Sequence, residues 1–197
     1  MIAFLKGRLE YIDPTHVVIN VNGVGYHVNI SLQTFSAIKE QENIKLFTHL
    51  AIREDAHILF GFAQEGEKKL FQQLISVSGV GPSTAIVMLS YMDNQELKSA
   101  IIREDAAALQ GIKGIGGKTA QRVIIELRDK LKKESWEDSQ PVISAGPNNT
   151  VKKEALSALL TLGLPKAVAE KSIDSVLKKS GNTITLEDLV KQALKNA

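Results

Sequence analysis

The 197-residue chain contains no cysteine. This absence excludes a disulfide framework, a cysteine-based zinc site and an iron–sulfur cluster, and it fits a reducing compartment. Long apolar runs are missing as well, since the opening stretch MIAFLKGRLEYID places charges within its first ten positions. We therefore expect neither a secretory signal nor a membrane span, and we expect a cytoplasmic protein.

The chain also lacks a strong charge of either sign, because its formal net charge is +2 with 23% charged residues. With 44% hydrophobic residues, it is long enough to bury the cores of one to three small domains. The charge is unevenly distributed, since seven basic residues stand against two acidic ones between Leu109 and Lys133. A polyanionic partner, if there is one, is therefore expected to bind the middle of the chain.

Residues 1–63 show the two-residue alternation that is typical of β-strands. One alternating run precedes the pair Asn22-Gly23 and another follows it, and Asn-Gly between two such runs is a strong hairpin signal. The apolar members of the two runs are Val17, Ile19, Val21, Val24, Tyr26, Val28 and Ile30. With IAFLKGRLEYI, IKLFTHL and HILFGF, we expect about five short strands closed into a small barrel.

The apolar period becomes helical over residues 64–134, where Asp93 and Glu96 also form a capping-box pattern. Residues 135–149 collect proline, glycine, serine and asparagine without a sustained period, so we expect a flexible linker there. Beyond it, residues 150–197 show three short amphipathic helices, with Pro165 in the first turn of the second and Thr185 opening the third. The sequence therefore predicts an α+β protein with a barrel, a helical block and a small helical tail.

The stretch GIKGIGGKTAQRV, residues 111–123, looks like the phosphate-binding loop of nucleotide hydrolases. That loop has the form G-x-x-x-x-G-K-[ST], because its length sets how the backbone N–H groups wrap the phosphates. Counting back from Lys118, the first glycine would have to stand at position 112, which is Ile112, and Gly111 comes one residue too early. The spacing therefore argues against nucleotide binding.

The same stretch is the second copy of a tandem motif. LISVSGVGPSTAIVML aligns with LQGIKGIGGKTAQRVI at a constant offset of 35 residues. In each copy, two glycines around an apolar residue permit a tight turn with positive φ between two helices, and a small alanine lets those helices cross closely. We therefore predict two helix-hairpin-helix motifs, with Val80 and Ile115 filling the space between the helices.

The free backbone N–H groups of such a hairpin, beside a helix N-terminus, suit a phosphate oxygen and read no base edge. Lys118 and Arg122 lie four residues apart on one helix and could add charge-assisted contacts. The predicted DNA-binding residues are Gly79, Val80, Gly81, Ser83, Gly114, Ile115, Gly116, Lys118, Thr119 and Arg122. The simpler alternative is a pair of structural glycine turns with solvated basic residues, which the duplication disfavours.

Two other functions fit part of the pattern. A lyase-type DNA glycosylase would use Lys118 as a Schiff-base nucleophile, but it needs a downstream aspartate in a packed helix, and Asp138 falls in the expected linker. A scaffold protein would use both hairpins for protein contacts alone. The histidines show neither helical i, i+4 pairs nor a carboxylate constellation, so we expect no metal site; they are His16, His27, His49 and His57.

In combination, the motifs resemble the RuvA family of bacterial Holliday-junction branch-migration proteins. The resemblance rests on VNGVGYHV, REDAHILFGF, SGVGPSTA, KGIGGKTAQRVIIELRDKL and the linker to a small helical tail, and it covers essentially the whole chain. It implies an OB-type barrel in residues 1–63, tandem helix-hairpin-helix motifs in 64–134, a flexible linker in 135–149 and a three-helix, motor-binding domain in 150–197.

The resemblance also implies a non-catalytic DNA-binding subunit without a cofactor, acting in recombination and repair. Four subunits would form a plate for an open, square-planar four-way junction, with one tetramer or two on the DNA. The implied protein partners are the ATP-driven motor RuvB and the RuvC resolvase. Glu54 and Asp55 match the acidic pin of the family, and the apolar runs around them place them near a hairpin tip.

Three positions depart from the pattern of the family. Ser83 stands where a basic residue is common, Gly117 precedes Lys118, and Leu164 replaces an expected aromatic residue. We therefore expect phosphate binding to depend more on backbone N–H groups and on Lys118, while an apolar partner surface remains in the tail.

Overall fold

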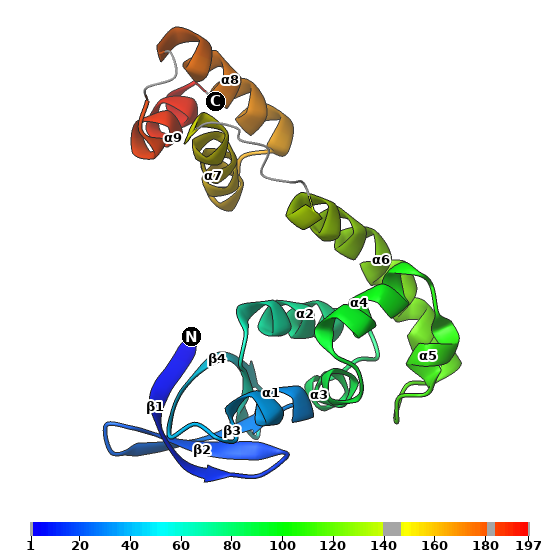
Figure 1. The fold of residues 1–197 in the computed structure, drawn as a ribbon. Helices are drawn as coiled ribbons and strands as arrows, with labels where there is room; N and C mark the ends of the chain where they lie inside the picture. Colours follow the sequence, from blue (N-terminus) through cyan, green and yellow to red (C-terminus); the bar gives the residue numbers. More distant parts are fainter. Residues whose placement is uncertain (1, 140–146, 181–183, 197) are drawn as a thin grey trace. The chain divides into compact units, whose positions relative to one another are not determined.

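A computed structural model describes residues 2–139, 147–180 and 184–196. The chain divides into two compact units, Met1–Glu137 and Asp138–Ala197. The elements that begin in the first unit are β1 (Phe4–Ile12), β2 (His16–Val21), β3 (Val24–Ile30), α1 (Leu32–Ile38), β4 (Asn43–Ile52), β5 (His57–Phe62), α2 (Glu65–Ile75), α3 (Pro82–Tyr91), α4 (Asn94–Ile102), α5 (Ala106–Gln110) and α6 (Gly117–Ser139) (Figure 1).

The five strands form a closed barrel in the order β1-β2-β3-β5-β4. All neighbouring strands are antiparallel except β3 and β5, which pair in parallel. Asn22 and Gly23 have positive φ angles of 51° and 88° and form the predicted turn between β2 and β3. The inward-facing residues form one buried cluster that includes Val17, Ile19 and Leu46. The expected α+β fold with a five-stranded barrel is confirmed.

Closure of the barrel brings side chains of β3 and β4 close to the backbone of β5 at Gly61. A Cβ atom built at this glycine would lie 2.6 Å from Val28 Cγ1 on β3 and 2.9 Å from Leu46 Cδ1 on β4. Both distances are shorter than normal van der Waals contacts, so a side chain at position 61 would displace the buried side chains of Val28 and Leu46.

Helix α1, between β3 and β4, is an element that the sequence pattern did not predict. Ser31 caps it, because its hydroxyl accepts a hydrogen bond from the backbone N–H of Thr34 at 3.0 Å. The side-chain hydroxyls of Ser31 and Thr34 both donate to the buried carboxylate of Glu67 on α2, at 2.7 Å and 2.9 Å respectively. This buried polar cluster ties the barrel to the helices that follow it.

The barrel and the helices that follow it, which the sequence analysis divides at residue 63, share a hydrophobic core. Phe60 and Phe62 of β5 belong to the same buried cluster as Phe71 of α2 and Leu127 of α6. The ring centroids of Phe62 and Phe71 lie 4.9 Å apart. This packing explains why residues 1–137 form one compact unit.

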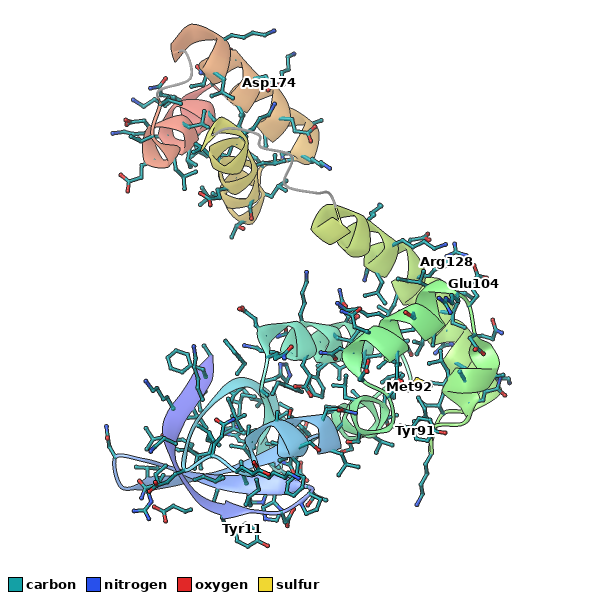
Figure 2. The ribbon with its side chains drawn as sticks, in the orientation of Figure 1. Tyr11, Tyr91, Met92, Glu104, Arg128 and Asp174 are labelled. Atoms are coloured by element: carbon teal, nitrogen blue, oxygen red, sulfur yellow. The ribbon has the colours of Figure 1, made fainter. Side chains whose placement is uncertain are left out.

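Two local interactions shape the turns of the helical block. Asp93 and Glu96 form the predicted capping box at the start of α4. Glu104, with a positive φ of 62°, lies in the turn between α4 and α5, and its carboxylate accepts a hydrogen bond from Arg128 Nη1 at 2.7 Å (Figure 2). Arg128 therefore holds this turn against α6.

The expected linker at residues 135–149 is shorter than the sequence analysis predicts. Helix α6 continues to Ser139, and α7 begins at Pro147. The helix can continue because the first helix-breaking residue after Gly117 is Pro141, while Pro147 is compatible with a first helical turn. Residues 140–146 lie outside the described residues.

The second unit contains α7 (Pro147–Thr161), α8 (Lys166–Ser180) and α9 (Leu186–Lys195). Their apolar faces form a small core that includes Leu159, Ile173 and Leu189. Thr185 caps α9 as predicted, whereas Pro165 precedes α8 instead of lying in its first turn. The three expected helices of the tail are therefore present.

Candidate nucleic-acid interface

The first predicted hairpin joins α2 to α3. Gly79 has a φ of +94°, a conformation that L-amino acids with a side chain rarely adopt. Val80 is 4% exposed, and its backbone N–H donates to Val77 O at 3.0 Å, which closes the turn. Ala85 on α3 is completely buried. The local geometry is therefore that of a helix-hairpin-helix turn, as the sequence predicts.

The second hairpin, between α5 and α6, repeats this geometry. Gly114 has a φ of +92°, Ile115 is 5% exposed, and the backbone N–H of Ile115 donates to Ile112 O at 3.0 Å. Ala120 is buried at the position that corresponds to Ala85. The sequence repeat is thus a structural repeat.

Both hairpins present backbone donors at the start of a long helix, α3 in one case and α6 in the other. None of the described residues accepts a hydrogen bond from the following backbone N–H groups: those of Gly79, Gly81, Ser83 and Thr84 in the first hairpin, and those of Gly114, Gly116, Gly117, Lys118 and Thr119 in the second. Such unoccupied donors at a helix N-terminus attract anions.

The two hairpins differ by one donor, which the sequence analysis overlooked. Pro82 has no backbone N–H, and the residue aligned with it at the offset of 35 is Gly117, which has one. The sequence alignment of the two repeats already shows this difference, because it pairs Pro82 with Gly117.

The hairpins contact each other through the first turns of α6. Arg122 Nη1 donates a hydrogen bond to the backbone carbonyl of Ser78 at 3.1 Å, immediately before Gly79. A Cβ atom built at Gly79 would lie 3.9 Å from Thr119 Oγ1, which is an ordinary contact distance. Residues of the second motif therefore line the turn of the first, and the two turns lie side by side.

Basic side chains outnumber acidic ones at this surface, where Glu126 lines the same shallow hollow as Lys118 and Arg122. Lys113, Lys118 and Arg122 are exposed, and no carboxylate of the described residues forms an ion pair with them. Ser83, which aligns with Lys118, is exposed as well and adds no charge. The second hairpin is therefore the more strongly cationic of the two.

Glu54 and Asp55 lie at the tip of the hairpin formed by β4 and β5. The last paired residues of the two strands are Ile52 and His57, and the backbone N–H of Arg53 donates to Ala56 O at 2.8 Å. Both carboxylates are exposed, and neither forms an ion pair with any part of the chain that the structure describes. The structure therefore places two exposed carboxylates at one tip of the barrel, beside the exposed Arg53, where the sequence predicts them.

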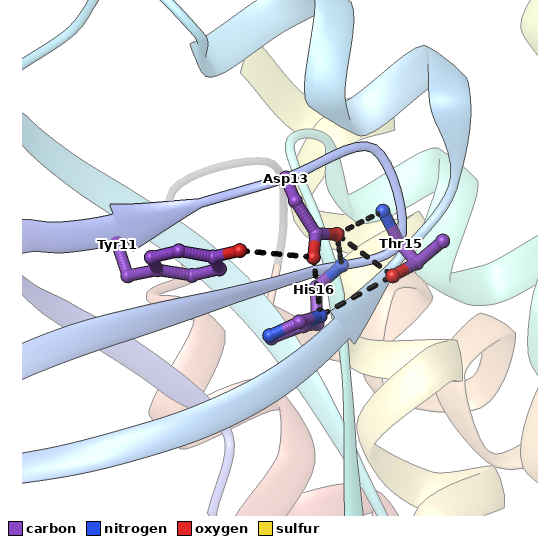
Figure 3. A network of polar contacts seen from close by, with 4 residues as sticks. All are labelled: Tyr11, Asp13, Thr15 and His16. Atoms are coloured by element: carbon purple, nitrogen blue, oxygen red, sulfur yellow. Dashed lines mark hydrogen bonds and ion pairs between the residues drawn. The ribbon is translucent and has the colours of Figure 1, made fainter.

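A polar cluster at the turn between β1 and β2 has a local structural role. The carboxylate of Asp13 accepts hydrogen bonds from the hydroxyl and backbone N–H of Thr15 and lies 3.0 Å from His16 Nδ1 (Figure 3). The hydroxyl of Thr15, followed by its backbone N–H, lowers the pKa of Asp13 to about 2. The His16 ring in turn stacks on Tyr11 and on His27.

The remaining histidines form no constellation that resembles a metal site. His49 packs against Phe71, and burial followed by the charge of Lys68 lowers the pKa of its imidazole. Among the residues that the structure describes, no group of three or more histidine, aspartate or glutamate side chains could hold a metal ion. The same residues include no helix that is long and apolar enough to cross a membrane.

The geometry of α6 argues against the glycosylase alternative. Lys118 and Asp138 lie on the same helix, 20 residues apart, which corresponds to roughly 30 Å along its axis. Asp129, 11 residues after Lys118 on the same helix, lies roughly 16 Å from it along the axis, and its carboxylate pairs with the Arg128 guanidinium at 2.9 Å. Neither aspartate can therefore assist a Schiff-base reaction at Lys118.

The second unit presents apolar side chains on its surface. Leu160, Leu162, Val168 and Leu194 are at least 37% exposed. Leu164, by contrast, packs partly against the core, and its N–H donates to Leu159 O beside Gly163, which has a φ of +93°. These bonds close the end of α7 in a Schellman-type turn, so Leu164 serves the fold of the unit.

Comparisons with known proteins cover nearly the whole chain. Residues 1–61 match the family model of the RuvA N terminal domain, residues 71–129 that of the SAM-like helix-hairpin-helix tandem, and residues 150–197 that of the RuvA C-terminal domain. The chain is 54% identical to the Holliday junction branch migration complex subunit RuvA of Cytophaga hutchinsonii over 99% of both chains. The proteins of the same name from Christiangramia forsetii and Flavobacterium psychrophilum are 48% identical over 99% of both chains and 47% identical over their full lengths.

Proposed function

Because the chain belongs to the RuvA family, we propose that it binds four-way (Holliday) junction DNA by structure and without sequence preference. It acts as the non-catalytic DNA-binding subunit of a branch-migration complex in recombination and repair. The observation that carries the proposal is the pair of adjacent hairpins with unoccupied backbone donors at the starts of α3 and α6. Donors of this kind grip the sugar-phosphate backbone and leave the base edges unread.

The proposed phosphate-binding residues are those of the two turns and of the helix starts behind them. Gly79 and Gly114 provide the backbone conformation, Val80 and Ile115 anchor the turns in the core, and Lys118 adds a flexible positive charge. The full set is Gly79, Val80, Gly81, Ser83, Gly114, Ile115, Gly116, Lys118, Thr119 and Arg122.

Glu54 and Asp55 form the proposed acidic pin. In a homotetramer, two carboxylates from each subunit would meet at the crossover and repel the phosphates there, while the outer hairpins attract the arms. This field would hold the junction open and square-planar without any bond-breaking step. The exposure of both carboxylates at the tip of the β4–β5 hairpin, without an ion pair among the described residues, supports this role.

The second unit is the proposed docking module for the RuvB motor. Its exposed apolar side chains, among them Leu162 and Leu194, are the kind of surface that a protein partner covers. The proposal also includes RuvC as a partner, one or two tetramers on the junction, and a cytoplasmic location, where the bacterial chromosome lies.

Binding of a synthetic four-way junction tests the proposed function. Junctions of two unrelated sequences should bind equally, and affinity should fall steeply with salt, with a log–log slope of about 0.9 per phosphate neutralised. Combined Glu54→Gln and Asp55→Gln substitutions should raise binding of plain duplex relative to the junction, while the sizing profile stays unchanged. Base-specific or salt-insensitive binding would contradict the proposal, and retention of no DNA at all would favour a scaffold.

A further inference from the structure

The contact between Arg122 and Ser78 assigns Arg122 a role that differs from simple phosphate binding. Arg122 lies on α6, behind the second hairpin, but its Nη1 donates to a carbonyl in the first hairpin at 3.1 Å. That carbonyl belongs to the residue directly before Gly79, whose φ of +94° sets the direction of the turn. A charge-assisted hydrogen bond at this point restrains the turn at Gly79.

The contact has no counterpart in the other copy. The residue aligned with Arg122 at the offset of 35 is Val87, an exposed apolar residue on α3 that cannot donate a hydrogen bond. No described residue bonds to the carbonyl of Lys113, which aligns with Ser78. The second motif therefore braces the first hairpin through this bond, and among the described residues no bond from the first motif braces the second hairpin.

The brace from Arg122 supports the hairpin that has fewer phosphate-binding groups of its own. The first hairpin has Pro82 in place of a backbone donor and Ser83 in place of a lysine, so its phosphate binding depends on the placement of its four remaining backbone donors. The guanidinium is planar and rigid, and only one of its nitrogen atoms is used on Ser78.

On the basis of the proposed function, we infer that Arg122 is a positioning residue: it holds the turn of the first hairpin in its phosphate-binding conformation through the Ser78 carbonyl. Its loss then weakens the grip of the first hairpin, although Arg122 itself lies on the helix of the second. A lysine at this position keeps the charge but is one bond shorter, so it cannot replace the fixed fork of the guanidinium.

A double-mutant cycle on four-way junction binding tests this inference. Arg122→Lys should weaken binding by about tenfold, the usual effect of one charge-assisted hydrogen bond. In a Gly79→Val background, which already distorts the first hairpin, the same change should have little further effect. Lys118→Ala is the matched control, because Lys118 lies one turn earlier on α6 and makes no contact with Ser78 among the described residues; its effect should be additive with Gly79→Val.

Two outcomes would overturn the inference: full binding by Arg122→Lys, or an effect of Arg122→Lys that is additive with Gly79→Val. Either would make Arg122 a plain source of charge.

Amide hydrogen exchange without DNA separates this inference from the proposed function. The backbone N–H of Val80 is bonded to Val77 O and that of Ala85 to Gly81 O, so both should be protected in the native protein. Arg122→Lys should speed exchange at these two amides and leave Ile115 and Ala120 in the second hairpin unchanged. Unchanged exchange at Val80 and Ala85 would refute the brace even if junction binding is confirmed, and faster exchange would support it even if the native chain binds no junction.

Discussion

At the scale of single residues, the two hairpins are unequal in spite of their shared backbone geometry. Gly79 and Gly114 have nearly the same φ, but the aligned residues Ser83 and Lys118 differ by one charge. Both side chains are exposed at the start of a helix. Position 83 of the first hairpin could therefore hold a basic side chain, as position 118 does in the second hairpin.

A lysine placed at that position should strengthen DNA binding. Ser83→Lys is expected to raise junction affinity by about threefold to tenfold in dilute salt and to steepen the log–log salt dependence by about 0.9, because one more phosphate is neutralised. Binding titrations at several salt concentrations measure both effects. Ser99→Lys adds the same charge to an exposed position of α4 and should leave the slope unchanged; equal effects of the two variants would mean that only net charge matters.

The pKa of Asp13 makes a second prediction at this scale. Its pKa is lowered from 3.8 to about 2 by the bonds from Thr15, so the unfolded chain binds the proton more readily than the folded one. The stabilisation by Asp13 is therefore complete above pH 3.8 and is lost as the pH falls through about 2. Denaturant midpoints of Asp13→Asn and of the native chain should converge over this range, whereas a constant gap would show that the carboxylate charge is unimportant.

At the scale of elements, Glu67 joins the barrel to the helical block. Glu67→Ala removes the acceptor of two buried hydroxyls, those of Ser31 and Thr34, and leaves a cavity behind them. It should lower the free energy of unfolding by about 2–4 kcal/mol. Glu65→Ala, in the exposed first turn of the same helix, should change it by less than about 0.5 kcal/mol. Comparable losses in chemical denaturation would contradict the role assigned to the buried cluster.

The elements also show what could be predicted from the sequence. The alternation of apolar residues, the Asn-Gly turn and the repeated glycine motif are local signals, and they located the strands and both hairpins. Helix α1 was missed because it is short and because its stability depends on Glu67, which lies more than 30 residues away in sequence. The bond from Arg122 to Ser78 was missed for the same reason, since a sequence repeat does not reveal which copy contacts the other.

At the scale of the whole molecule, the division into two units predicts separable functions. A chain that ends at Ser139 keeps the barrel, both hairpins and α6, so it should bind the junction as the full chain does. It should no longer stimulate ATP hydrolysis by RuvB, because α7, α8 and α9 are absent. Junction titration and an ATPase assay with the purified motor measure the two effects. Full stimulation by the shortened chain would remove the docking role from the second unit.

The parallel pairing of β3 with β5 fixes the order in which the barrel can assemble during synthesis. The strands β1, β2 and β3 are linked by short turns and can pair as soon as they leave the ribosome, whereas Ile30 must wait for Gly61. Until Gly61 emerges, the edge of β3 has no partner. Slow translation of the codons just before β5 would therefore prolong the interval in which the nascent chain is most prone to aggregate.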